Sequence, residues 1–98
     1  MISGRVWKGH FEQYGVRQDL KIRKFQAKRG GPVVGEGKDE LGEFTISGKA
    51  HSNGAVDFKK NYNGRHIIIF MGMMSENNSL IEGDWEDSGA RGTFKIEV

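Results

Sequence analysis

The sequence predicts an all-β fold, an antiparallel up-and-down barrel of about eight short strands. Apolar and polar residues alternate with a period of two along much of the chain, and no stretch carries a helical stripe. Glycine accounts for 15 of the 98 residues, which is too frequent for a long helix to persist. Because the connections between alternating segments are short, neighbouring strands should pair antiparallel within one domain spanning residues 1–98.

Each expected strand is marked by its own apolar positions. Leu20 and Ile22 alternate with charged residues, and Ile81 and Trp85 do so around Gly83. The same pattern gives eight segments in chain order: those around Trp7, Leu20–Ile22, Val33–Val34, Phe44–Ile46, Val56–Phe58, His66–Met71, Ile81–Trp85 and Phe94–Val98.

Two turns constrain the registers. A three-residue loop at Ser52–Gly54 pairs Ala50 with Val56, and it places four apolar side chains on one face: Phe44, Ile46, Val56 and Phe58. The Asn63-Gly64 turn leaves two registers open. A two-residue turn directs inward Ile67, Ile69 and Met71, whereas a three-residue loop from Tyr62 to Gly64 directs inward Ile68 and Phe70. In either case the strand leaves large apolar side chains on its outer face.

Residues 35–46 and 83–96 form a weak internal repeat of two similar glycine-rich hairpins. Two related four-stranded halves explain the repeat, as does the general likeness of such hairpins. With Trp7 near the start and Gly83-x-Trp85 late in the chain, the pattern resembles barrels of the avidin and lipocalin kind. That resemblance implies a ligand held inside the barrel, although no ligand-contact motif carries over. The many large residues expected inside favour a filled interior over a large cavity.

The turns of a meander alternate between the two ends of a barrel, so four loops should meet at one rim. These loops are Gln13–Gly15, Asp39–Leu41, Asn63–Gly64 and Ser88–Ala90. Five residues of this rim form a candidate site for a polar small molecule: Tyr14, Asp39, Tyr62, Arg65 and Arg91. Glu40 and Asp87 add charge to it, and a solvated turn surface is the alternative interpretation.

The sequence offers no catalytic residues, no metal site and no cofactor motif. The three histidines, His10, His51 and His66, lack the spacing of metal ligands. Gly35-x-Gly37 is followed by another strand instead of the helix that a dinucleotide site needs. We therefore expect a protein that is not an enzyme and binds no cofactor.

Six cations fall within residues 17–29 beside a single acid, Asp19, and Phe25 is expected to point outward among them. Such a stretch could follow phosphates and stack a base. Two acidic tracts, Glu36–Glu43 and Glu82–Asp87, oppose this interpretation, and a charged edge strand explains the cations as well. Nucleic acid is not an expected partner.

The chain has no cysteine, so disulfides are excluded, and it shows neither a signal peptide nor a long apolar run. We expect a cytoplasmic protein without a membrane partner.

The preferred function is that of an interaction module. A barrel strand that faces water should alternate cleanly, so the surplus apolar face of residues 66–71 requires cover. We expect a homodimer, or docking to another protein, through an outer surface formed by His66, Ile68 and Phe70. Binding of a small molecule at the rim or inside the barrel is the alternative, and an enzyme is the third possibility.

Overall fold

A computed structural model describes residues 6–98. Nine strands are present in this part of the chain: β1 (Lys8–Gln13), β2 (Val16–Asp19), β3 (Ile22–Ala27), β4 (Gly31–Asp39), β5 (Gly42–Ala50), β6 (Ala55–Asn61), β7 (Ile67–Met74), β8 (Leu80–Asp87) and β9 (Ala90–Glu97). Among these residues there is no helix long and apolar enough to cross a membrane.

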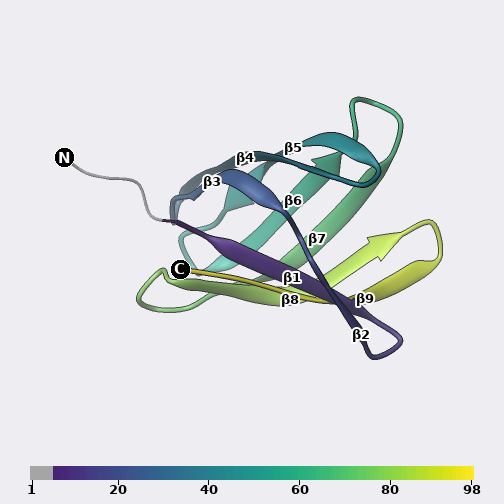
Figure 1. Cartoon of the computed structure of the whole chain (residues 1–98). Helices are drawn as coiled ribbons and strands as arrows, with labels where there is room; N and C mark the ends of the chain where they lie inside the picture. Colours follow the sequence, from purple (N-terminus) through teal and green to yellow (C-terminus); the bar gives the residue numbers. More distant parts are fainter. Residues whose placement is uncertain (1–5) are drawn as a thin grey trace.

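The strands form one antiparallel sheet that curls strongly into a half-barrel (Figure 1). Its order is β2-β1-β9-β8-β7-β6-β5-β4-β3. Consecutive strands from β3 to β9 pair as a meander, and the β1–β2 hairpin joins this meander through pairing of β1 with β9. The expected all-β antiparallel architecture is confirmed. The sheet differs from a closed barrel because β2 and β3, consecutive in sequence, occupy its two opposite edges.

The prediction of a single strand at Leu20–Ile22 is wrong. Two strands, β2 and β3, lie before and after this position, so the sheet formed by residues 6–98 has nine strands instead of the expected eight. β2 pairs with β1 as far as Asp19, and the chain then turns at Lys21, whose φ is 52°. The Leu20 N–H donates to the carbonyl of Gly9 at 2.9 Å, and its side chain turns into the core. Leu20 and Ile22 therefore lie on either side of a break between strands.

Phe25 was expected to point outward and instead lies in the core. The register between β3 and β4 shifts between Ile22 and Lys24, so Arg23 is an extra residue on β3. This bulge reverses the alternation and brings Phe25 inside, where its ring meets those of Trp7 and Phe58 edge-on, with centroids 5.3 and 6.1 Å away.

The β5–β6 hairpin has the expected register, with Ala50 opposite Val56 across the loop at residues 52–54. The four apolar side chains predicted to share its inner face are all buried. In the β6–β7 hairpin, Tyr62 faces His66 across a three-residue loop at residues 63–65. This loop lies one residue later than the expected three-residue alternative, and it gives the same inward face.

The outer surface expected at His66, Ile68 and Phe70 is therefore wrong. Phe70 is only 2% exposed and stacks on Phe58 at 4.8 Å, while Ile68 packs against the core. His66 is half-buried beside Tyr62. The residues that face outward on β7 are Ile67, Ile69, Met71 and Met73.

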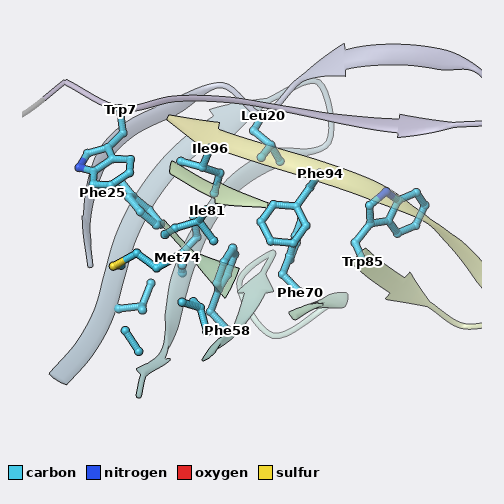
Figure 2. Close-up of a cluster of buried hydrophobic side chains, with 14 of the residues drawn as sticks. Trp7, Leu20, Phe25, Phe58, Phe70, Met74, Ile81, Trp85, Phe94 and Ile96 are labelled. Carbon is cyan, nitrogen blue, oxygen red and sulfur yellow. The ribbon is translucent and has the colours of Figure 1, made fainter. Parts of the chain in front are cut away.

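Large apolar side chains fill the interior (Figure 2), and glycines allow close approach of the strands around it. Phe58, Phe70 and Phe94 form its centre, with the ring of Phe94 nearly perpendicular to both other rings. Gly72 and Gly83 face each other on β7 and β8, and a Cβ on either would lie 2.1–2.2 Å from a backbone oxygen. The two strands can come this close only without side chains, which lets the sheet curl tightly here.

One end of the half-barrel is held by Arg29. Its guanidinium donates to Asn78 Oδ1 at 3.0 Å and to the Ser75 carbonyl at 2.8 Å, and it reaches the carbonyls of Ser52 and Met74 at 3.5 and 3.4 Å. These contacts join the β3–β4, β5–β6 and β7–β8 connections. The functional candidates lie at the other end.

Candidate functional site: a cavity at the open end

A cavity of about 330 Å³ lies at the end of the half-barrel opposite Arg29. Its lining comes from the ends of strands that the four predicted rim loops connect: Gln13 before the β1–β2 turn, Asp39 to Leu41 at the β4–β5 turn, Tyr62 and His66 on either side of the β6–β7 turn, and Asp87 before the β8–β9 turn. The meander thus brings together residues that are far apart in sequence.

A buried ion pair forms one wall of this cavity. Lys60, on β6, is 2% exposed, and its Nζ lies 3.2 Å from Asp39 Oδ2. The same oxygen accepts a 2.5 Å hydrogen bond from the Tyr62 hydroxyl, and Asp39 Oδ1 accepts one from the Leu41 N–H at 2.9 Å. The Lys60 ammonium also lies over the Phe44 ring, 4.4 Å from its centroid.

Burial and pairing act in opposite directions on this cluster. Burial alone would raise the pKa of Asp39, but hydrogen bonds from Tyr62 and the Leu41 N–H and the charge of Lys60 bring that pKa below its usual value. Burial lowers the pKa of Lys60 despite the attraction of Asp39. Burial and the hydrogen bond to Asp39 raise the pKa of Tyr62, so its hydroxyl remains a donor.

A second carboxylate, Asp87, faces the cavity from the end of β8. Its Oδ2 lies 2.8 Å from His66 Nε2. Its Oδ1 is buried and has no hydrogen-bond partner among residues 6–98. A buried carboxylate oxygen without a donor is unfavourable, so Asp87 is only half satisfied.

The remaining wall is apolar and partly aromatic. Phe11, Ile68, Phe70 and Trp85 contribute to it. The Phe11 and Trp85 rings meet edge-on at 5.9 Å, and Trp85 Nε1 donates to the carbonyl of Glu12 at 3.2 Å. The indole is therefore fixed in place, and the cavity combines a rigid aromatic surface with a few converging polar groups.

The structure places two of the five predicted rim residues in the cavity wall and three outside it. Asp39 and Tyr62 meet in the cavity wall. Tyr14 is 92% exposed, and Arg65 is exposed outside the cavity lining. Arg91 lies on the outer surface, in a shallow depression beside Ile69 and Met71. A rim position alone therefore did not decide whether a side chain turns inward.

Two of the main cavity residues, Lys60 and His66, were absent from the predicted ligand site. The alternation Phe58-x-Lys60-x-Tyr62 places Lys60 on the inner face, and that signal was available in the sequence. The internal repeat also marks Asp87, because Asp39 and Asp87 each lie four residues after the first glycine of their repeat and end equivalent strands. His66 has the same alternation as Ile68 and Phe70, so the three-residue loop alternative also directed it inward.

Three of the six cations in the basic stretch contact acids or loop acceptors. Arg23 contacts Glu36 at 3.1 Å and Glu43 at 3.5 Å, and Lys21 contacts Glu40 at 3.0 Å. Arg29 is engaged by the loops described above. Among residues 6–98, no group of three or more acids and histidines is arranged to hold a metal ion.

The barrel-like architecture expected from the sequence is confirmed in part, since the chain forms a curled antiparallel meander. Its interior is filled around Phe58, Phe70 and Phe94, and the cavity occupies only the open end. Comparison of the chain with protein-family models, with curated proteins and with solved structures gives no match.

Proposed function

We propose that this protein binds a small molecule in the cavity at the open end of its half-barrel. The observation that carries the proposal is the buried cluster of Lys60, Asp39 and Tyr62 in the cavity wall. Buried ion pairs contribute little to stability compared with apolar residues of similar volume, so a fold gains little from placing one here. Fixed polar groups beside an aromatic wall are typical of sites that orient a ligand.

The dimensions also support a small ligand. The cavity of about 330 Å³ lies at the lower end of the range for ligand pockets, which is about 300 to 1,000 Å³. The polar groups that face it are already held by hydrogen bonds to their neighbours, so little ordering is needed when a ligand enters. Ligand binding inside the barrel is also what the resemblance to avidin and lipocalin barrels implies.

The test is a fragment screen followed by amide NMR spectra of the isotope-labelled protein. We expect at least one fragment to shift the amides of cavity residues such as Phe11, Ile68 and Asp87. Ile68→Trp should fill the cavity and abolish these shifts. Ile69→Trp is the matched control, because the neighbouring side chain points to the outer surface. Shifts that survive Ile68→Trp, or a library that leaves all cavity amides unmoved, would contradict the proposal.

Self-association is a second candidate function, favoured by a different observation. Four apolar side chains follow one another along the outer face of β7, each 42–54% exposed: Ile67, Ile69, Met71 and Met73. Because the neighbouring β6 and β8 carry charged residues on this face, the four form one stripe. A second copy of the chain would cover it.

Light scattering at several protein concentrations tests this candidate. We expect a dimer that Met71→Lys converts to a folded monomer, because a lysine in an apolar interface loses hydration without a partner. Ser47→Lys, on the outer face of β5, should leave the dimer intact. A wild-type chain that stays monomeric at all concentrations would refute self-association.

A further inference from the structure

The charges around the cavity do not balance. Four carboxylates, Asp19, Asp39, Glu40 and Asp87, and one ammonium, Lys60, are among its lining groups. Lys60 is already paired with Asp39, and Glu40 is paired with Lys21 from the β2–β3 connection. The cavity is therefore acidic, and it attracts cations rather than anions.

Asp87 is the carboxylate with a place left for a donor. His66 serves one of its oxygens, and the other is buried and without a partner among residues 6–98. A carboxylate turns easily about its last side-chain bond, so either oxygen can meet a group that enters from the cavity. A donor that carries a positive charge would satisfy both the missing hydrogen bond and the unbalanced charge.

The aromatic wall suits the same kind of group. Lys60 shows how this interior holds an ammonium, with Nζ 4.4 Å from the Phe44 centroid and 4.9 Å from that of Tyr62. Trp85 lies two residues before Asp87 on β8, and its ring meets that of Phe11, a second aromatic residue of the cavity lining. Aromatic rings attract cations and also accept the apolar body that carries them.

From these three observations we infer that the ligand is a small organic cation, an ammonium group carried on a compact apolar or aromatic body. The ammonium lies against Asp87, and the body packs along Phe11, Ile68 and Trp85. This inference rests on the proposed function and specifies the ligand class for the same cavity.

The experiment compares three probes of similar size: phenethylamine, phenethyl alcohol and phenylacetate. Each is titrated into the labelled protein, and affinity is measured from the shifts of cavity amides. We expect the amine to bind about tenfold or more tightly than the alcohol, and phenylacetate most weakly. Asp87→Asn should remove the preference for the amine and leave the affinity for the alcohol nearly unchanged. Glu86→Gln is the matched control, since this neighbouring carboxylate faces outward.

Asp19→Asn provides a second variant at an exposed position, in case Asp87→Asn does not fold. This variant should lower the affinity for the amine by a smaller factor, about two- to threefold, because it removes only one negative charge from the electrostatic field of the cavity. Equal binding of the alcohol or the anion, a preference for the amine that Asp87→Asn leaves intact, or an affinity for the amine that Asp19→Asn leaves unchanged would overturn the inference while cavity binding stands. The inference also falls if none of the probes moves cavity amides although other fragments do. If no fragment moves them, the proposed function fails as well.

Discussion

Lys60 is the residue that departs most from the rules of a small β core. Its ammonium is buried among aromatic rings and has one carboxylate partner, Asp39. Alternation along β6 predicts that its side chain points inward, but the residue type argues against burial. From its residue type, Lys60 is therefore expected at the surface. The carboxylate that makes its burial tolerable, Asp39, ends β4 and lies 21 residues earlier in the sequence.

The ion pair should respond unequally to loss of its two members. Asp39→Asn leaves a buried ammonium without a counter-charge, and we expect a loss of about 3–5 kcal/mol in the free energy of unfolding. Lys60→Met keeps the apolar stem, and Asp39 retains its donors from Tyr62 and Leu41, so the loss should stay within about 1 kcal/mol. Urea unfolding measures the free energy of unfolding of both variants. An equal loss of stability in the two would contradict the expected difference between removing Asp39 and removing Lys60.

Acid should weaken the fold through Asp39. Its pKa is lowered in the folded protein, so the unfolded chain takes up a proton first as the pH falls past the ordinary value of 3.8. The stability due to Asp39 is thus present above that pH and is lost as the pH falls through the lower folded pKa. The difference in unfolding free energy between wild type and Asp39→Asn should shrink from about pH 5 to about pH 2. A constant difference over this range would argue against a lowered pKa.

At the scale of elements, the β5–β6 hairpin was predictable and the edges of the sheet were not. The Ser52–Gly54 loop fixes the β5–β6 register because only a three-residue loop keeps Phe44 and Phe58 on one face. Between the two edge strands, Leu20 and Ile22 alternate with charged residues as they would in one continuous strand. The hydrogen bond from the Leu20 N–H to the Gly9 carbonyl and the positive φ of Lys21 instead break the chain into β2 and β3. Such a break depends on contacts with β1, which no local pattern contains.

The facing glycines of β7 and β8 should be intolerant of any side chain. A methyl group at Gly83 would lie 2.1 Å from the Met71 carbonyl oxygen and 2.4 Å from the Gly72 Cα, so the strands must separate. We expect Gly83→Ala to lower stability by about 1–3 kcal/mol or more. Gly31→Ala is the control, because the added carbon would make only ordinary contacts of 3.4 Å or longer. Thermal unfolding measures the stability of both variants. Similar melting temperatures for the two would show that the curl of the sheet does not depend on Gly83.

For the whole molecule, the two ends of the half-barrel differ in structure. At the end opposite the cavity, Arg29 joins three loops by donating to side-chain and carbonyl acceptors. Charged hydrogen bonds of this kind contribute about 1.5–3 kcal/mol each when partly buried, so Arg29→Met should lower the melting temperature. The same variant should leave fragment shifts at the open end unchanged. Altered shifts in the cavity would show that the two ends are coupled.

The architecture followed from alternation and short turns, while the site required the three-dimensional curl. The order of the meander predicts that Asp39, Tyr62 and Asp87 approach one rim, since their turns share an end. Which side chains turn inward there depends on the loop at residues 63–65, whose position the sequence left open. The outward expectation for Phe70 depended on the same register, and it is corrected by the stack of Phe70 on Phe58.

Binding in the cavity can be seen in a crystal structure of this protein soaked with fragments that bind in solution. We expect fragment density between Phe11, Trp85 and Asp87, with the ion pair of Lys60 and Asp39 unchanged. Fragments that occupy only the outer stripe of β7, beside a cavity closed by its own side chains, would contradict this expectation.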